Sequence, residues 1–329
     1  MPASDASDDT VSLFDPAQAV VADELAEAPR SGSYKDAAAR GYAFDPSRVP
    51  GDFPVAEAFG HPPDADTASA RDARARCWCP FMDKPCSKLL SAAQTGICSI
   101  RYKAEGFDET TWAICQHRLK GDPFEDAVGR HFGARSKDAA LVTELRLDQP
   151  RMSLDGVGVL VEADDEVDLV GIEAQTIDTR GGSVKPLWEA YSSGEPDRWR
   201  ERYPGGAKFG VNTTNVWKRL LPQVMNKGRL YRGWDSKLYV LIQDPVFQFI
   251  TRRMQLDRLP RSSASKAEIV WLLWDYDEGA PRDPRTGMRT SAVGDVVYTT
   301  IEQVEDAFVN IAFTPRNEFV KRLRKKLGR

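Results

Sequence analysis

The sequence predicts an α/β protein with a central mixed β-sheet flanked by helices, and a small loop-rich cysteine module before it. From about residue 126 onward, apolar runs typical of strands mix with helical patterns. All five cysteines lie between Cys77 and Cys115, in a stretch rich in Pro and Asp. Residues 1–40 are acidic and rich in Ala, Asp and Ser, which is typical of a flexible segment. We therefore expect a flexible segment at 1–40, the cysteine module at 41–125 and the α/β domain at 126–329.

The expected elements are assigned from hydrophobic period and from Gly and Pro positions. Two strands are expected at 151–163 and 166–178, separated by an acidic turn, because both runs are apolar and rich in Val. The other expected elements are helices at 17–28, 122–133, 136–147 and 213–228 (with a kink at Pro222), a strand and then a helix in 237–254, a strand at 267–277, and a strand and then a helix in 293–313.

Composition excludes some classes of protein. The chain is 41% hydrophobic and has eight Trp, so a core of ordinary size is available. No stretch approaches the roughly 18 consecutive apolar residues of a membrane span. The N-terminus is acidic and lacks the basic start and apolar run of a secretory signal. We expect a cytoplasmic, reducing location, in which disulfides are rare.

The net charge of −4 argues weakly against a nucleic-acid partner, but the basic residues are clustered. Residues 198–232 hold nine Lys and Arg against Glu201 alone, interleaved with Trp, Tyr and Phe. Such clustering suits phosphate binding, although a solvated helix face has the same composition. Residues 316–329 hold seven basic residues and one Glu, which we read as a solvated helix end or a further phosphate contact, with the first favoured.

The cysteine spacing is C-x-C-x6-C-x11-C-x16-C. Four thiolates are the usual cage of a tetrahedral structural metal, and such a metal would supply folding energy to a module that we expect to have few apolar contacts. Five cysteines for four places leave one spare, and His117 could compete as a ligand. Buried free thiols are the alternative. A redox role lacks the C-x2-C motif near a βαβ unit.

The two strands around the acidic turn carry a second candidate site. Asp155 lies in the first strand, and Glu173 and Gln175 lie two residues apart in the second, so they point to the same side. A hairpin would place Asp155 beside Glu173, where a hard cation such as Mg²⁺ could bind and act on a phosphodiester. The alternative is that Asp155 begins a turn with Gly156 and that Glu173 is an acid of an edge strand.

Several segments together carry a resemblance to a known family. They are AEAFGH (56–61), CPF (79–81), PCSK (85–88), GICS (96–99), ICQHR (114–118), MSLDG (152–156), GIEAQTID (171–178) and NVWKR (215–219). In this order they resemble the NotI family of type II restriction endonucleases, within the PD-(D/E)xK nuclease superfamily. The match departs at the last cysteine station, where the family commonly has Cys-Pro and this chain has Cys115-Gln116.

The resemblance implies that Cys79, Cys86, Cys98 and Cys115 bind a structural metal and that Cys77 is the extra cysteine. In the family this metal is iron, and zinc accepts the same four thiolates. With four protein ligands, the metal would have no open position for chemistry.

The resemblance also makes Asp155 and Glu173 ligands of catalytic Mg²⁺. Gln175 then replaces the superfamily's Lys; a Gln amide cannot act as a general base, so it can only orient water or a phosphate oxygen. Glu144, expected on the helix before the first strand, is the candidate for completing the site, with an exposed helix acid as the alternative.

The implied activity is Mg²⁺-dependent cleavage of both strands of duplex DNA at a specific, GC-rich palindrome by a homodimer. Two alternatives are a metal-stabilised DNA-binding regulator without catalysis and a nuclease of low sequence specificity. The candidate DNA-contacting residues are Lys185, Arg198, Arg200, Lys218 and Arg219.

Overall fold

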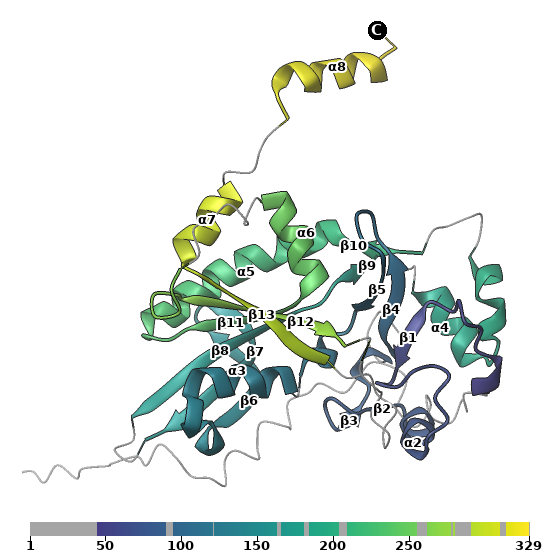
Figure 1. Cartoon of the computed structure of the whole chain (residues 1–329), viewed down its shortest axis with the longest axis horizontal. Coiled ribbons are helices and arrows are strands. Elements are labelled where there is room, and N and C mark those ends of the chain that lie inside the picture. Colours follow the sequence, from purple (N-terminus) through teal and green to yellow (C-terminus); the bar gives the residue numbers. More distant parts are fainter. Residues whose placement is uncertain are drawn as a thin grey trace, which may run out of the picture.

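A computed structural model describes residues 45–328 except 90–94, 121, 163–165, 181–183, 204–208, 255–261, 278, 280–290 and 310–313. The expected flexible segment at 1–40 and the expected helix at 17–28 lie outside these residues. The chain folds as a mixed α/β structure with a six-stranded central sheet (Figure 1).

The central sheet is mixed, as the sequence predicts. Its strands are β6 (Ala140–Asp148), β7 (Arg151–Val161), β8 (Val167–Gln175), β11 (Leu238–Gln243), β12 (Ile269–Tyr276) and β13 (Ser291–Thr299). They lie in the order β13-β12-β11-β8-β7-β6. β11 is parallel to both β8 and β12, and the remaining neighbours are antiparallel. The apolar runs in β8, β11 and β12 are therefore central strands.

Helices cover both faces of this sheet. One face packs against α3 (Asp122–Phe132), whose Phe124 and Val128 would meet any Cβ added at Gly156 or Gly158 of β7. The other face lies under α5 (Thr213–Gly233), α6 (Asp244–Met254) and α7 (Ile301–Val309). These helices fulfil the sequence predictions, and α5 runs across Pro222 as one helix.

The expected helix at 136–147 is wrong. A short 3-10 helix, η5 (Gly133–Asp138), ends there and the chain continues as β6, which pairs with β7 from Ala140 to Asp148. Leu141 and Leu145 have helical spacing, but Val142 and Thr143 are β-branched and favour a strand. Pairing with β7 makes this segment a strand, and the local sequence pattern does not show that tertiary contact.

The module around the cysteines contains more regular structure than expected. Its strands β1 (Val55–Ala58), β4 (Ile97–Lys103) and β5 (Glu109–Ala113) form an antiparallel sheet. Val55, Ile97 and Trp112 are fully buried and belong to the same apolar cluster as α5, so the expectation of few apolar contacts is wrong. The shorter elements are η2 (Pro46–Arg48), α2 (Ala68–Arg76), β2 (Trp78–Cys79), β3 (Lys84–Pro85), η3 (Ser87–Leu89), η4 (Gln116–Leu119), β9 (Asp178–Thr179), α4 (Lys185–Ser192), η6 (Pro196–Arg202) and β10 (Val211–Asn212).

A buried carboxylate joins this module to the central sheet. Glu57 of β1 is fully buried and accepts hydrogen bonds from Ser99 Oγ at 2.9 Å, Arg118 Nε at 3.1 Å and Tyr276 Oη at 2.8 Å. These donors come from β4, η4 and β12 respectively. Burying a charge is costly unless it is paired, so this network fixes how the two parts of the chain meet.

Replacing Arg118 with methionine is therefore expected to lower the free energy of unfolding by about 3–5 kcal/mol, because Glu57 would keep its buried charge without a cation. Urea unfolding followed by circular dichroism measures this. The control is Arg130→Met, which removes a partly exposed ion pair with Asp126 and should change stability by less than about 1 kcal/mol. An Arg118→Met protein as stable as the control would show that the network contributes little.

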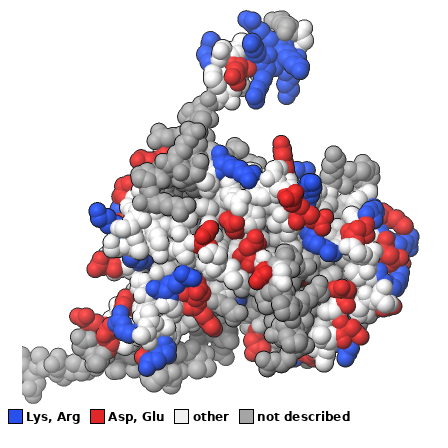
Figure 2. All heavy atoms as spheres, viewed as in Figure 1, with Lys and Arg blue, Asp and Glu red and all other residues white. Residues whose placement is uncertain are grey.

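The C-terminal helix α8 (Arg316–Lys326) has no buried residue, which agrees with a solvated helix end. Figure 2 shows its Lys and Arg side chains gathered on an exposed helix, whereas the visible face of the sheet domain mixes both charges. Among the described residues, no helix has both the length and the apolar character needed to cross a membrane.

Candidate active site

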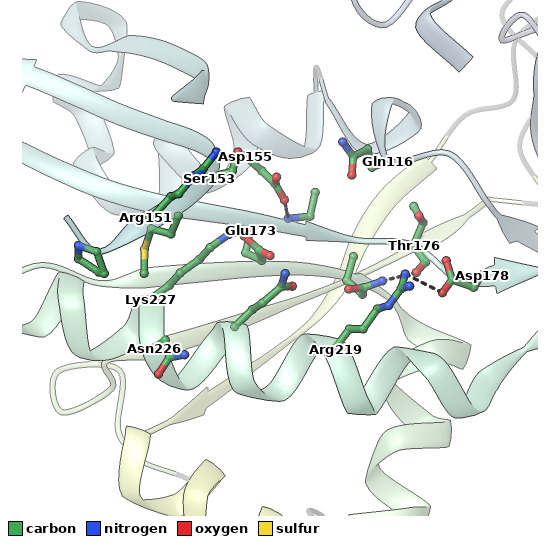
Figure 3. A pocket seen from close by; sticks show the side chains of 15 residues that line it. Gln116, Arg151, Ser153, Asp155, Glu173, Thr176, Asp178, Arg219, Asn226 and Lys227 are labelled. Carbon is green, nitrogen blue, oxygen red and sulfur yellow. Dashed lines mark hydrogen bonds and ion pairs between the residues drawn. The ribbon is translucent and has the colours of Figure 1, made fainter. Parts of the chain in front are cut away.

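A polar cavity of about 760 Å³ opens where β7 and β8 face helix α5 (Figure 3). The chain supplies its lining from five elements and from residues beside them. The polar lining residues are Gln116 of η4, Arg151, Ser153 and Asp155 of β7, Glu173 and Gln175 of β8, Thr176 after β8, Asp178 of β9, and Arg219, Gln223, Asn226 and Lys227 of α5.

The strand register brings Asp155 and Glu173 together. Gly156 pairs with Ile172 in the antiparallel β7–β8 ladder, so Asp155 and Glu173 are opposite neighbours on the face that α5 covers. Asp155 Oδ2 accepts a hydrogen bond from the Ala174 backbone N–H at 3.0 Å, and the Asp155 and Glu173 side chains are within hydrogen-bonding contact. The structure therefore places these two acids side by side.

Glu173 lies in an unusual electrostatic environment. Its side chain is 5% exposed. Burial, and then the charge of Asp155, raise the pKa of Glu173 to about 7, although the Lys227 ammonium acts in the opposite direction. Two carboxylates this close repel each other, so the pair favours a shared proton or a cation between its oxygens. Oxygen ligands converging in this way are what a hard divalent cation requires.

Gln175 lies two residues beyond Glu173 and also lines the cavity, as the alternation of strand side chains predicts. Its amide Nε2 donates a hydrogen bond to the Thr176 carbonyl. The residue thus presents a neutral amide at a position beside the two acids, and that amide cannot exchange a proton near neutral pH.

Glu144 does not line the cavity. It lies in β6, on the strand beyond β7, with a φ of 60° that is uncommon for a residue with a side chain. Its carboxylate accepts a hydrogen bond from Lys120 Nζ at 2.7 Å, and this contact lowers the pKa of Glu144. The structure therefore brings Asp155, Glu173 and Gln175 together and leaves Glu144 in a separate ion pair.

Of the five candidate DNA-contacting residues, Arg219 reaches the cavity, where it forms an ion pair with Asp178 at 3.3 Å. Lys185, Arg198 and Arg200 lie on α4 and η6 and pair with Glu189, Glu201 and Asp52 respectively. Lys218 is exposed on α5 beside Arg219. The basic segment is therefore divided between the cavity wall and ion pairs elsewhere.

The polar face of α5 lines the cavity, and apart from Arg219 it was not among the site residues predicted from the sequence. Arg219, Gln223 and Lys227 are spaced by four residues and Asn226 by three from Gln223, so one helix face carries all of them into the cavity. The residues of α5 between these polar positions include Leu220, Leu221 and Val224, which are apolar and buried. This amphipathic spacing is readable from the sequence, and it would have separated cavity residues from other basic residues.

The cysteines lie apart from the cavity. Cys79, Cys86, Cys98 and Cys115 are each no more than 6% exposed, and none forms a disulfide. Burial, and then the charges of Cys115, Cys86 and Cys79, raise the pKa of Cys98. These interactions place the four cysteines in one region of the fold. Burial also raises the pKa of Cys79 to about 12.

Backbone N–H groups surround these sulfurs. Phe81 and Met82 donate to Cys79, and Lys88 and Leu89 donate to Cys86, and these bonds lower the thiol pKa values. N–H groups directed at sulfur stabilise thiolates, so this donor set suits a tetrathiolate metal.

Gly60 contributes a further N–H group, which donates to Cys98 Sγ at 3.4 Å. Its φ is +78°, and a Cβ there would lie 2.4 Å from the Pro80 ring. Only glycine fits this approach to the cysteine cluster.

The remaining members of the cluster have other contacts. Cys77 Sγ lies 3.9 Å from the Arg74 carbonyl, and its backbone, at a φ of 52°, ends helix α2. His117 Nε2 is 3.1 Å from Ser87 Oγ, and burial lowers the pKa of His117 to about 4. Across the described ranges, no three His, Cys, Asp or Glu side chains already have the arrangement of a metal-ligand set. The four-cysteine metal site therefore stays a prediction.

A comparison with protein families identifies the protein. The family described as Restriction endonuclease NotI matches residues 65–287, which is more than half of the chain and includes both the cysteines and the cavity residues. No curated protein matches the chain. The protein is a type II restriction endonuclease, a hydrolase that cleaves DNA at specific sites. Within that class it belongs to the NotI family.

Proposed function

We propose that this endonuclease makes Mg²⁺-dependent double-strand breaks at a GC-rich palindrome. The observation that carries the proposal is the convergence of Asp155 and Glu173 on one wall of the cavity, with Ala174 N–H holding the first in place. Glu173 is buried and Asp155 is half-buried, and a divalent ion would offset the repulsion between these adjacent carboxylates. The mixed sheet with its acids on adjacent central strands suits a PD-(D/E)xK core.

Asp155 and Glu173 would hold the Mg²⁺ through their carboxylate oxygens. When bound, Mg²⁺ supplies Lewis-acid stabilisation of the charge that develops on a phosphodiester under attack by water. Gln175, with its neutral amide, orients the attacking water or a phosphate oxygen and takes no proton. The role expected for Glu144 is less well supported, because its carboxylate is bound to Lys120.

Duplex DNA would enter along the polar face of α5. Arg219 lies in the cavity and suits a phosphate contact, while Lys218 beside it is exposed. Lys185, Arg198 and Arg200 are candidates for more distant contacts or for guanine edges in the major groove, which is consistent with a GC-rich site. Cleavage of both strands of a palindrome requires two active sites, and a homodimer provides them with matching symmetry.

The four cysteines would hold one structural iron or zinc ion. Their burial, their mutual proximity and the N–H groups directed at Cys79, Cys86 and Cys98 suit a tetrathiolate. The module would then comprise residues 41–125 and the nuclease domain residues 126–329, after an acidic segment at 1–40. We expect the protein to act in the cytoplasm, where a reducing environment keeps the cysteines as thiols.

The test is digestion of DNA of known sequence with sequencing of the fragment ends. With Mg²⁺ we expect discrete fragments whose ends share one palindrome, and with EDTA we expect none. A continuous smear would favour a nuclease of low specificity. A gel shift with no cleavage, under all divalent ions tried, would favour a DNA-binding regulator.

A further inference from the structure

Lys227 of α5 points into the cavity directly opposite the acidic pair (Figure 3). Its ammonium forms an ion pair with Glu173 Oε2, and the two side chains are 7% and 5% exposed. A fully buried Lys is uncommon, and every other buried residue of α5 with a described side chain is apolar, a tyrosine or a glycine. Lys227 is thus the one buried cation among the described side chains of α5.

The packing of α5 fixes Lys227 in this place. One turn beyond Lys227, the ring of Tyr231 covers Gly171, where an added Cβ would lie 2.1 Å from the ring. Gly171 and Glu173 are two residues apart in β8 and share a face. Because Tyr231 sits on Gly171, the turn before it must sit on Glu173. The helix register, rather than chance, sets the Lys227–Glu173 contact.

The simplest role for Lys227 is to neutralise Glu173, and the charges of the loaded site argue for more. Asp155 and Glu173 carry two negative charges, which a bound Mg²⁺ would balance. Lys227 would then add one positive charge beside the metal. A phosphodiester brings one negative charge, which this ammonium would balance; of the other cations that line the cavity, Arg219 is already paired with Asp178 and Arg151 is exposed. Gln175 supplies no charge, and Lys227 is the cation closest along α5 to the acids.

We propose that Lys227 is a further catalytic residue, whose ammonium contacts a non-bridging oxygen of the scissile phosphate. This inference rests on the proposed function. An ammonium has three N–H donors, and the bond to Glu173 uses one of them. A fixed positive charge offsets the charge that grows on that oxygen as water attacks, and such preorganised contacts have large effects on the rate. Lys227 transfers no proton in this role. It thereby supplies from a helix the positive charge that Gln175 cannot supply from the strand.

The experiment compares Lys227→Met and Lys227→Gln with wild type in single-turnover cleavage under saturating enzyme and Mg²⁺. The matched control is Arg229→Met, which removes a cation two residues away whose partner is Glu305. We expect the Lys227 variants to cleave about 10²–10³-fold more slowly, and the control to remain within about threefold of wild type. DNA affinity, measured with Ca²⁺ in place of Mg²⁺, should change by less than about tenfold.

Stereospecific phosphorothioates at the scissile position separate catalysis from structural support. Sulfur accepts hydrogen bonds poorly, so replacing the contacted oxygen should slow the wild type and Arg229→Met. The same replacement should have little further effect on the Lys227 variants, because the contact is already lost. Should Lys227→Met fail to fold, Lys227→Gln, whose amide can still donate to Glu173, carries the comparison.

Cleavage by both Lys227 variants within threefold of wild type would overturn the inference, as would an undiminished sulfur effect in them. Asp155→Asn, assayed in parallel, tests the proposed site separately. If wild type cleaves and Asp155→Asn does not, a result against Lys227 leaves the proposed function standing. If wild type cleaves no DNA, the proposed function itself fails.

Discussion

Replacing Asp155 with asparagine is expected to lower the single-turnover rate of DNA cleavage by about 10³-fold. Asparagine keeps the size of the side chain and an oxygen that can accept the Ala174 N–H bond, so the strand pair should persist. What it removes is the negative charge that faces Glu173. Without that charge the site holds a divalent cation weakly, and the Lewis-acid contribution of several kcal/mol is lost.

Rapid-quench cleavage of a plasmid with one site measures this rate, and thermal unfolding shows that the variant is folded. Asp168→Asn is the matched control, because Asp168 lies on β8 but pairs with Arg135 outside the cavity. The control should cut at the wild-type rate. Asp155→Asn cutting as fast as Asp168→Asn would show that the two acids on β7 and β8 are not the catalytic pair.

The sequence could predict this acidic pair because its placement depends on local rules alone. Two apolar strands joined by a short turn form an antiparallel pair, and alternation then decides which side chains share a face. Glu173 and Gln175 must therefore lie on one side. Asp155 follows once the turn sets the register. The central strands β11 and β12 were predicted for a related reason, since their continuous apolar runs leave few other choices.

Other parts of the site depended on tertiary contacts. The β6 strand, nearly all of it exposed, exists through its ladder with β7, and its own residues also fit a helix. Glu144 was expected on that helix, but it lies in the strand, where its carboxylate pairs with Lys120. Lys227 was one of nine basic residues in a segment. The amphipathic spacing of α5 narrows the choice to the cavity side of the helix, and the packing of Tyr231 on Gly171 shows that Lys227 faces the acids.

The cysteine module has more regular structure and a larger apolar core than the sequence predicted. The expectation was that a metal holds a loop-rich segment together, but Val55, Ile97 and Trp112 give the module an apolar core. β1 is four residues long and is flanked by Pro and Asp residues, so its sequence shows no clear hydrophobic period. A metal in this module would therefore add to a core rather than replace one, and its removal should disturb the cysteine loops first.

Replacing Cys98 with serine is expected to reduce bound metal from about one ion per chain to none, because the hard hydroxyl is a poor fourth ligand for a thiolate-preferring ion. The buried Cys79 and Cys86 would then be protonated, since burial and mutual repulsion raise their pKa values by more than the backbone N–H groups lower them. Elemental analysis of the purified protein measures the metal and distinguishes iron from zinc. Cys77→Ser is the matched control and should keep the metal.

The same substitution is expected to lower cleavage by at least about tenfold, because of where the fourth cysteine lies. Gln116, which lines the cavity, follows Cys115 directly. Arg118, which binds Glu57, lies three residues after Cys115. Loss of a metal bond at Cys115 frees the start of η4 and so loosens one cavity wall, in the way that loss of a supporting contact displaces catalytic groups. If Cys98→Ser retained one metal ion per chain, or if Cys77→Ser lost its metal, the cysteines that bind the metal would have to be assigned differently. Metal-free Cys98→Ser that still cuts at the wild-type rate would instead show that the cavity wall needs no support from the cysteine cluster.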